Sequence, residues 1–301
     1  AMRHMLPFQY IETIARMGSI RKAADTLSIT PSALNRRLLS IERELGVDIF
    51  ERVASGVRLS TAGEILLQHI RNQISDMERV KSRIADLSGM RRGNVSVAAS
   101  AEFLTEFLPW QISRYRQEFP GVTFVVDQVA RGLAEQALVD HSADIALIFE
   151  PLKLADFQVV CRLAQPLMCI CDSDHPLAAG TDLRLYECAE FPVVLPGQES
   201  GVRALLEAAA VRLGLDLRAT IQSNNPEFVR RCSRQPYQIS FDIPINIPDD
   251  LAERNLVARA IDSRDIAGGF LFVGHLKGRA LPVAAARFLE QIVADLSDRF
   301  D

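Results

Sequence analysis

The sequence predicts three parts in order: a small helical domain, a long helix, and a larger α/β domain. Short helical segments with clear start signals lie before residue 46, and residues 65–88 contain no Pro or Gly. From residue 95 onward, apolar runs typical of strands alternate with segments at helical spacing. With 301 residues, the chain is long enough for both domains to have their own cores.

Two short helices that meet at a tight turn are predicted first. The apolar residues after Ser19 fall at helical spacing, and Ser19 is a good N-cap. Thr30 can cap the second helix, and Pro31 suits its first position, where the missing N–H costs nothing. The second helix has an apolar stripe that we expect to pack inward, formed by Leu34, Leu38, Ile41 and Leu45.

Polar and basic side chains lie off that stripe on the first turns of the second helix, at Ser32, Asn35 and Arg36. This end of the second helix enters the major groove in helix-turn-helix proteins. Asn forms two hydrogen bonds with adenine and Arg forms two with guanine, so Asn35 and Arg36 are the predicted base-reading residues. The alternative is that they are ordinary solvated residues. The succession of helix, turn, helix and basic loop favours DNA reading.

The basic loop completes the layout of a winged helix-turn-helix. Arg52 and Arg58 flank its tip at residues 54–56, where they would contact phosphate or the minor groove. A plain solvated turn is the alternative interpretation of these two residues. The complete set of predicted DNA-contacting residues is Arg21, Thr30, Pro31, Ser32, Asn35, Arg36, Arg52 and Arg58.

The long helix connects the two domains. Thr61 and Glu64 have the spacing of a capping box. Its apolar residues step by three or four: Leu66, Ile70, Ile74, Met77, Val80, Ile84 and Leu87. A connecting helix has little of its own chain to cover such a stripe, so we expect it to pair with the same helix of a second subunit. The alternative is packing on the chain's own C-terminal domain.

Charge is divided unequally between the two parts of the chain. The formal net charge is -4, with 15 Lys+Arg and 10 Asp+Glu in residues 1–92 against 19 and 28 in residues 93–301. The N-terminal part is therefore the one that can sit on phosphate. Its excess of positive charge is modest, so binding should need the summed contacts of a dimer.

Other classes of function find little support in the sequence. No apolar run has the length of a membrane span. There is no Gly-rich phosphate loop, nucleophile elbow or metal-binding His pair, so we expect no enzyme, no cofactor and no metal site. Five cysteines without a signal peptide fit a cytoplasmic protein. Cys169 and Cys171 should share a strand face, but no neighbouring residue is seen that would lower a thiol pKa for redox sensing.

The C-terminal part is predicted to contain repeated strand-helix-strand units, which imply a largely parallel sheet. The expected strands are 95–99, 122–129, 144–149, 167–171, 191–195, 239–243 and 269–274. The expected helices are 103–118, 133–139, 201–213 and 282–296.

These motifs closely resemble the LysR-type transcriptional regulators. The resemblance rests on Ser19, Ala23–Ala24, Leu27, Thr30, Ala33–Leu34 and Arg36, and continues through 41–46, 50–52 and 59–63. Pro31 and Asn35 stand where the family usually has Gln and Ser, so the DNA sequence preferred by relatives does not carry over. The resemblance implies a homo-oligomer, a dimer or tetramer joined through the linker helix, that binds double-stranded promoter DNA.

The resemblance also implies a two-lobed C-terminal domain, built like the periplasmic binding proteins, with a small-molecule effector in its cleft. The implied domains are 1–60 for DNA binding, 61–92 for the linker helix and hinge, and 93–301 for the effector. Lobe I would span about 93–165 and 267–301, and lobe II about 166–266. The competing interpretation is a solute-binding or metabolic protein whose N-terminal helices only dimerise.

Candidate effector residues lie where the predicted strands end, because ligands of open α/β sheets bind there. Ser100 fits a position where the family usually has Ser or Thr, and Arg131 stands where many relatives have Thr. Arg131 would favour an anionic effector. Glu102 could pair with Arg131, hold an amine, or merely favour a helix start. The full set is Ser100, Glu102, Phe103, Arg131, Phe149, Gln198, Ser200 and Asn224.

The sequence leaves two interpretations open for each of two positions, one aromatic and one acidic. Phe149 is either a cleft residue or plain core. Asp242 is either a cleft residue or a hydrogen-bonded structural acid. The segment 236–242 around it lacks the glycine pair that the family usually has there, so the crossing between the lobes is expected to be built differently.

Overall fold

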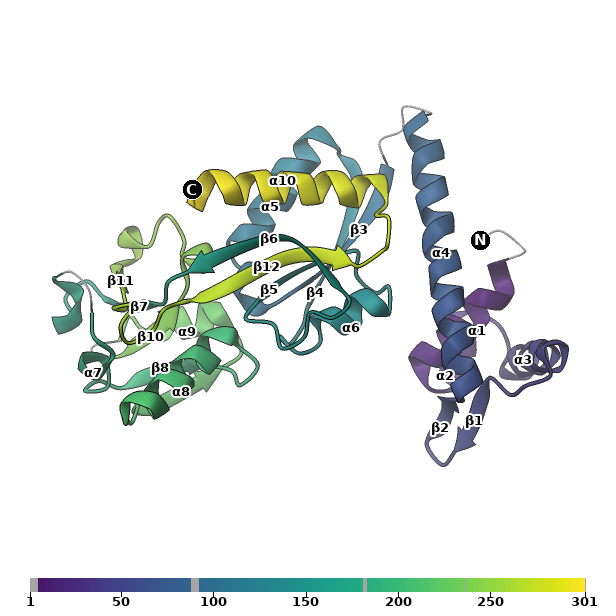
Figure 1. Cartoon of the computed structure of the whole chain (residues 1–301), viewed down its shortest axis with the longest axis horizontal. Coiled ribbons are helices and arrows are strands. Elements are labelled where there is room, and N and C mark those ends of the chain that lie inside the picture. Colours follow the sequence, from purple (N-terminus) through teal and green to yellow (C-terminus); the bar gives the residue numbers. More distant parts are fainter. Residues whose placement is uncertain (1–4, 88–91, 181–182, 236, 301) are drawn as a thin grey trace. The chain divides into compact units, whose positions relative to one another are not determined.

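The structure is a computed structural model that describes residues 5–87, 92–180, 183–235 and 237–300 (Figure 1). Contacts divide the chain into two compact units, Ala1–Lys81 and Ser82–Asp301. Residues 88–91, which fall in the predicted linker and hinge segment 61–92, lie outside the described residues. The first unit is built from α1 (Leu6–Met17), α2 (Ile20–Thr26), α3 (Pro31–Leu45), β1 (Phe50–Val53), β2 (Gly56–Leu59) and most of α4 (Thr61–Leu87).

The helix-turn-helix begins at the predicted capping residues. Ser19 Oγ accepts a hydrogen bond from the N–H of Lys22 at 3.4 Å, and Thr30 Oγ1 accepts one from Ala33 at 3.3 Å. Each bond satisfies an N–H that the first turn of a helix otherwise leaves unpaired. The start residues of α2 and α3 were thus predicted correctly.

The core of the first unit gathers the inner faces of its helices. Leu34 and Leu38 are buried as predicted, together with Ile14 of α1 and Ile70 of α4. The prediction for Leu45 is wrong, because this side chain is 49% exposed. Leu45 is the last residue of α3, next to the C-cap Gly46.

The β1–β2 hairpin is the predicted wing. Gly56 has a φ of 141°, and a Cβ built there would lie 2.2 Å from the carbonyl oxygen of Gly18. Glycine is therefore needed both for its backbone conformation and for space. The N–H of Val57 donates to the same Gly18 oxygen at 3.0 Å. These contacts fix the wing against the turn between α1 and α2.

The capping residue of helix α4 lies one position earlier in the chain than predicted. Ser60, not Thr61, is the capping residue, since Ser60 Oγ accepts the N–H of Gly63 at 3.0 Å. Thr61 is already helical. The adjacent polar residues Ser60 and Thr61 are both good caps, so sequence alone could not separate them.

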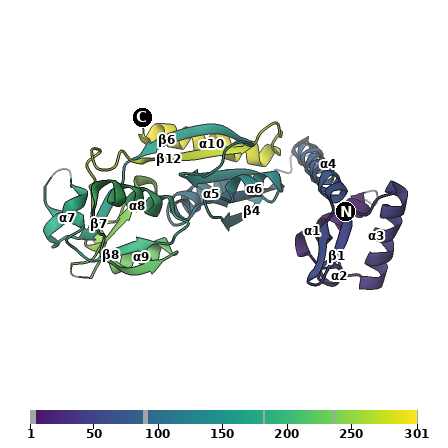
Figure 2. The same ribbon diagram turned by 60° about the horizontal axis from the view of Figure 1, so that its bottom comes forward.

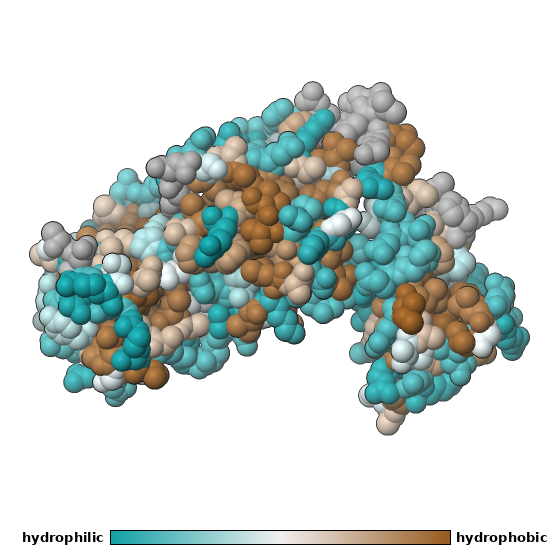
Figure 3. Space-filling view, in the orientation of Figure 1, coloured by the Kyte–Doolittle hydropathy of each residue, from teal (hydrophilic) through white to brown (hydrophobic). Residues whose placement is uncertain are grey.

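The apolar stripe of α4 changes its environment along the helix. Leu67 and Ile70 are buried in the core of the first unit, whereas Val80 and Ile84 are 45% and 58% exposed. The side chain of Leu87 lies outside the description. Brown areas in Figure 3 mark apolar side chains that reach the surface of the face shown there. The first half of the stripe therefore packs in the core of the first unit, and the second half has exposed apolar side chains at Val80 and Ile84.

The second unit contains two five-stranded sheets. The sheet of lobe I has the order β4-β3-β5-β12-β6, from β3 (Arg92–Ala99), β4 (Gly121–Gln128), β5 (Ile145–Phe149), β6 (Phe157–Gln165) and β12 (Gly269–Leu276). The sheet of lobe II has the order β11-β7-β10-β8-β9, from β7 (Met168–Asp172), β8 (Val193–Pro196), β9 (Ala219–Ser223), β10 (Ile239–Asp242) and β11 (Leu256–Ala260).

The prediction of largely parallel sheets is wrong, because both sheets are mixed. In lobe I, β3 pairs in parallel with β4 and β5, but β12 is antiparallel to β5 and β6. In lobe II, β8 is parallel to β9 and β10, but β7 is antiparallel to β10 and β11. The antiparallel pairs arise where the chain crosses between the lobes, from β6 to β7 and from β11 to β12. Strands β6, β9 and β11 were not predicted.

Helices cover both faces of the lobe I sheet, as Figures 1 and 2 show. Helices α5 (Phe107–Glu118) and α10 (Val283–Phe300) contact each other on one face, and α6 (Ala134–Val139) packs on β5 and β12 from the other. The predicted start of α5 at Phe103 is wrong, because Ala101–Phe103 form a separate 3-10 turn. Lobe II carries the predicted α8 (Gly201–Leu213) and two helices that were not predicted, α7 (Leu185–Cys188) and α9 (Pro226–Cys232).

A buried acid anchors the far end of α8. Both oxygens of Asp265 accept hydrogen bonds from the Arg184 guanidinium at 2.7 and 2.8 Å, and one also accepts the N–H of Leu185 at 2.8 Å. Arg212, near the C-terminus of α8, donates to the carbonyl oxygen of Asp265. Because α8 carries Ser200 at its opposite end, this network fixes the helix whose start faces lobe I.

The Asp265 network gives a testable pH dependence. Hydrogen bonding to Arg184 lowers the pKa of Asp265. Asp265→Asn should therefore lower the free energy of unfolding at pH 7 by about 2 kcal/mol, through loss of a charged, buried acceptor. A lowered folded-state pKa stabilises the fold above the unfolded value of about 4, and this contribution is lost as pH falls through the folded-state pKa.

Denaturant unfolding from pH 7 down to pH 3.5 would measure this effect. The gap between wild type and Asp265→Asn should narrow at the acidic end. Asp216→Asn, at an exposed position in the same lobe, is the matched control. Equal stability of wild type and Asp265→Asn at pH 7 would contradict the assignment.

Candidate functional site

Most of the predicted DNA-reading residues are exposed on the surface of the first unit. On α3, Leu34 and Leu38 face the core, and the opposite side of the helix is open to solvent. Arg36 is exposed on that side and Asn35 is half-buried beside it. The other predicted residues, which are all exposed, are Arg21, Thr30, Pro31, Ser32, Arg52 and Arg58. The side chains of the first turns of α3 are thus accessible to a large partner.

Local contacts organise this surface. Thr30 Oγ1 lies 3.2 Å from Ser32 Oγ at the start of α3. On the wing, an Arg58 nitrogen pairs with Glu51 Oε2 at 2.7 Å across the hairpin. This exposed ion pair contributes little to stability, but it directs the Arg58 side chain along the wing.

Arg37, which follows the predicted reading residue Arg36, was not among the predicted DNA-contacting residues. Its guanidinium lies 4.9 Å from the centre of the Tyr10 ring and donates a hydrogen bond to the Tyr10 hydroxyl. This pair ties α3 to α1. We assign Arg37 to the positioning of the reading helix, because its charged group is turned toward α1.

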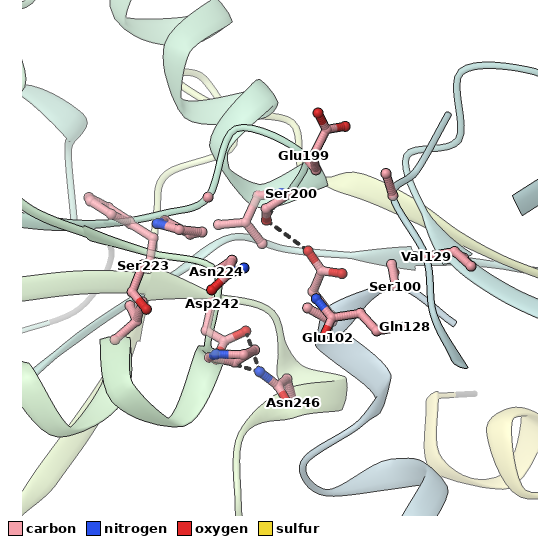
Figure 4. A pocket seen from close by; sticks show the side chains of 18 residues that line it. Ser100, Glu102, Gln128, Val129, Glu199, Ser200, Ser223, Asn224, Asp242 and Asn246 are labelled. Carbon is pink, nitrogen blue, oxygen red and sulfur yellow. Dashed lines mark hydrogen bonds between the residues drawn. The ribbon is translucent and has the colours of Figure 1, made fainter. Parts of the chain in front are cut away.

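A cavity of about 280 Å³ lies between the two lobes of the second unit (Figure 4). Its walls come from the ends of strands β3, β4, β8, β9 and β10 and from the starts of α8 and α9. The lining residues are Ser100, Ala101, Glu102, Gln128, Val129, Ala130, Pro196, Gly197, Glu199, Ser200, Val202, Ser223, Asn224, Pro226, Val229, Phe241, Asp242 and Asn246.

The cavity brings together half of the predicted effector residues. Ser100, Glu102, Ser200 and Asn224 line it. The other four do not belong to its lining: Phe103, Arg131, Phe149 and Gln198.

Each of the four outlying residues has a structural reason for its place. Phe103 and Phe149 are fully buried in the hydrophobic core, so Phe149 follows its core interpretation. Arg131 donates to the carbonyl oxygen of Glu150 at 2.9 Å. Strand β4 ends before Arg131, at Gln128. Gln198 is exposed, while its neighbours Gly197 and Glu199 line the cavity.

Most of the residues that line the cavity were not among the predicted effector residues. The rule that ligands bind beyond strand ends does point to Gln128–Ala130 after β4 and to Gly197 after β8. The mistake was to place the ligand contact at Arg131, a few residues too far along. Asn246 lies in a 3-10 turn, Pro244–Asn246, that no periodic pattern announces.

Glu102 is the central polar residue of the cavity. It is only 3% exposed, and its Oε1 accepts the hydroxyl of Ser200 at 2.8 Å. Ser200 in turn caps α8, since its Oγ accepts the N–H of Val202 at 3.2 Å. Glu102 comes from lobe I and Ser200 from lobe II, so this hydrogen bond joins the lobes across the cavity. It also places a carboxylate near the positive end of the α8 dipole.

Asp242 lines the cavity, and it fits both interpretations made from the sequence, a cleft residue and a hydrogen-bonded structural acid. Its two oxygens accept from Asn246 Nδ2 at 2.9 and 3.2 Å, and Oδ1 accepts the N–H of Ile243 at 2.9 Å. Burial raises the pKa of Asp242 to about 6, with Arg230 acting in the opposite direction and Glu102 adding to the rise. Asp242 is therefore a cavity residue and a hydrogen-bonded structural acid at the same time.

Further polar contacts join the lobes beside the cavity. Thr105 of lobe I donates to Asn246 Oδ1 at 2.5 Å, and Arg230 of lobe II donates to Glu106 Oε1 at 3.0 Å. Arg230 is buried and also donates to Glu227 Oε2 at 3.2 Å. The seam between the lobes thus consists of a few specific polar bonds.

The remaining predicted features concern cysteines, metals and membranes. Hydrogen bonds with Cys171 and Cys188, together with burial, raise the pKa of Cys169. The same hydrogen bond with Cys169, and the charge of Arg259, lower the pKa of Cys171, so the expectation that no neighbour lowers a thiol pKa is wrong for this residue. A high thiol pKa makes Cys169 a poor nucleophile. Within the described residues there is no group of three or more His, Cys, Asp or Glu side chains arranged to hold a metal ion. The described helices include none that is long and apolar enough to cross a membrane.

Comparisons with known proteins agree with this architecture. The RuBisCO operon transcriptional regulator of Allochromatium vinosum is 25% identical over 284 residues, which cover 94% of this chain and 93% of that protein. The structure of a full-length OxyR variant from Pseudomonas aeruginosa superposes with a TM-score of 0.71 at 17% identity, covering 97% of this chain and 94% of that chain.

A third comparison concerns the second unit. The regulatory domain of Synechocystis PCC6803 CcmR, solved in complex with 2-PG, gives a TM-score of 0.61 at 20% identity. It covers 69% of this chain and 99% of that chain. At such identities, the two structural matches establish the fold.

Family models identify both parts of the chain. The model of the bacterial regulatory helix-turn-helix protein, lysR family, matches residues 7–64. The model of the LysR substrate binding domain matches residues 88–297, which is more than half of the chain. The chain therefore belongs to the LysR family of transcriptional regulators.

Proposed function

We propose that this protein binds promoter DNA as a homo-oligomer and that a small-molecule effector in the interlobe cavity controls its activity. The proposed division of labour is residues 1–60 for DNA, 61–92 for linkage and oligomerisation, and 93–301 for the effector. In this division lobe I is about 93–165 with 267–301, and lobe II about 166–266. The observation that carries the proposal is the open, polar face of α3 beside a basic hairpin, within a LysR family chain.

The reading helix would insert the start of α3 into the major groove. Asn35 and Arg36 would then contact base edges, and Arg52 and Arg58 on the wing would contact phosphate or the minor groove. The start of α3 also directs its free N–H groups and its positive dipole end toward the DNA backbone. Arg21, Thr30, Pro31 and Ser32 complete the proposed contact surface.

The linker helix would join the subunits. Val80 and Ile84 expose apolar surface on successive turns of α4, and burial of such surface against the same helix of a second subunit is favourable. Two reading helices on one dimer would contact two half-sites about one DNA turn apart, or a multiple of it. The basic excess of each head is modest, so two heads are needed to sum the contacts.

The effector would act through the seam between the lobes. A ligand in the cavity touches residues of both lobes, including Ser100 and Glu102 of lobe I and Ser200 and Asn224 of lobe II. Binding would shift the arrangement of the DNA-binding heads only by as much as the ligand's affinity differs between two states of the protein. We further propose that the chain has no enzymatic activity and works in the cytoplasm, where promoter DNA is found.

Loss of a base-reading side chain should weaken sequence-selective binding. Asn35→Ala and Arg36→Ala should each lower the affinity for the preferred duplex by about 10- to 100-fold, since a good two-bond base contact is worth about 1–3 kcal/mol. Gel-shift assays of the full-length protein would use duplexes that the wild type selects from a random-sequence library.

Arg16→Ala is the control for this experiment, because it removes an exposed positive charge from α1. It should leave the sequence preference unchanged. Failure of the wild type to select any sequence, even at low salt, would favour the competing solute-binding interpretation. Unchanged selectivity of both α3 variants would remove Asn35 and Arg36 from the reading surface.

A charge in the linker stripe should break the oligomer. Ile84→Glu should halve the mass measured by light scattering or reduce it further, because burying a carboxylate at an apolar interface is costly. Gln68→Glu adds the same charge at an exposed position about 160° around the helix, and it should leave the mass unchanged. Retention of the wild-type mass by Ile84→Glu would exclude this stripe as the interface.

A further inference from the structure

The interlobe cavity carries acidic groups without a facing base. Its lining contains the carboxyl groups of Glu102, Glu199 and Asp242, and no Lys, Arg or His is among the described residues that line it. Glu102 and Asp242 lie close enough for the charge of Glu102 to raise the pKa of Asp242. In Figure 4, Glu199 points away from these two, which lie around the same space. The electrostatic character of the cavity is therefore acidic.

One oxygen of Glu102 is left without a partner. Oε1 accepts the Ser200 hydroxyl, whereas Oε2 is buried and has no hydrogen-bond partner among the described residues. A buried carboxylate oxygen without a donor is unfavourable, so the site gains when a donor arrives. Glu102 is one of the residues that line the cavity, and Figure 4 draws its carboxyl group among the labelled side chains around that space.

Two basic groups near the cavity are engaged elsewhere. Arg131 donates to the carbonyl oxygen of Glu150 and does not line the cavity. Arg230 lies below Asp242 at 3.6 Å and donates to Glu106, Glu227 and the carbonyl oxygen of Asn246. Neither guanidinium is presented to a ligand.

The position that would best suit an anion is also taken. A carboxylate bound at the start of α8 would profit from the helix dipole and from the Ser200 hydroxyl. Glu102 already occupies that place through its 2.8 Å hydrogen bond with Ser200. An anionic ligand entering the cavity would meet this carboxylate at close range and be repelled.

We propose that the effector of this cavity is a small molecule bearing an organic ammonium group, which donates to Glu102 Oε2. This inference rests on the proposed function, and it names the chemical class of the effector. An ammonium group supplies three hydrogen-bond donors. It also supplies the positive charge that the Glu102 carboxylate lacks as a partner in the cavity. The rest of the ligand would lie against Val129, Val202 and Phe241, with the amides of Gln128 and Asn224 available for polar substituents.

The test compares ligands that share a skeleton and differ in charge. Butylamine, 1,4-diaminobutane and 2-phenylethylamine would be titrated into the full-length protein by calorimetry, each beside the alcohol and the carboxylate of the same skeleton. At least one amine should bind about tenfold or more tightly than its alcohol, and the carboxylates should not bind.

Glu102→Gln tests the residue directly. Its side-chain carbonyl can still accept the Ser200 hydroxyl, so the seam is kept while the charge is lost. This variant should bind the amine about 10- to 100-fold more weakly, and Glu118→Gln, at an exposed position on α5, should bind it as the wild type does. Thermal unfolding of each variant would verify that it is folded.

Two outcomes would overturn the proposal. In the first outcome, a carboxylate binds more tightly than the amine of the same skeleton, and Glu102→Gln strengthens the binding of that carboxylate. The cavity would then still be an effector site, but one that prefers anions. In the second, no amine binds the wild type at millimolar concentration. The gel-shift assay on selected duplexes distinguishes these two outcomes from a failure of the proposed function, because sequence-selective DNA binding does not depend on the chemical class of the effector.

Discussion

The hydrogen bond between Ser200 and Glu102 is the constraint on which the second unit depends. At 2.8 Å it joins the lobes, it places a carboxylate at the start of α8, and it leaves the second oxygen of Glu102 buried without a hydrogen-bond partner among the described residues. The other end of α8 is held by Arg212 on the carbonyl oxygen of Asp265. A 13-residue helix fixed at both ends positions the Ser200 hydroxyl accurately, so the geometry of the cavity is set by side chains that are far apart in the sequence.

The first unit could be predicted in detail because its signals are local. The caps at Ser19 and Thr30 act within three residues, and the inward stripe of α3 follows from helical spacing alone. The errors have the same local scale. Leu45 fits the stripe but lies at the end of the helix, and Ser60 and Thr61 are both suitable caps.

The cavity was harder to predict because its chemistry is set by contacts between distant residues. The strand-end rule found Ser100, Glu102, Ser200 and Asn224, which occupy turns at the carboxyl ends of strands. It could not show that Arg131 bonds to a carbonyl oxygen instead of a ligand, which reverses the expected charge of the site. The mixed sheets have a similar cause, since β7 and β12 enter by crossing from the other lobe and no local pattern encodes strand direction.

A ligand in the cavity would contact some of the residues that join the two lobes. The seam includes Ser200–Glu102, Thr105–Asn246 and Arg230–Glu106, and two of these bonds involve residues that also line the cavity. A donor that reached Glu102 Oε2 would offset the charge of the carboxylate that accepts the Ser200 hydroxyl, so it would change the energy of the seam as well as the binding energy of the ligand. Because a ligand shifts an equilibrium only through its differential affinity, Glu102 is the residue through which that difference would arise.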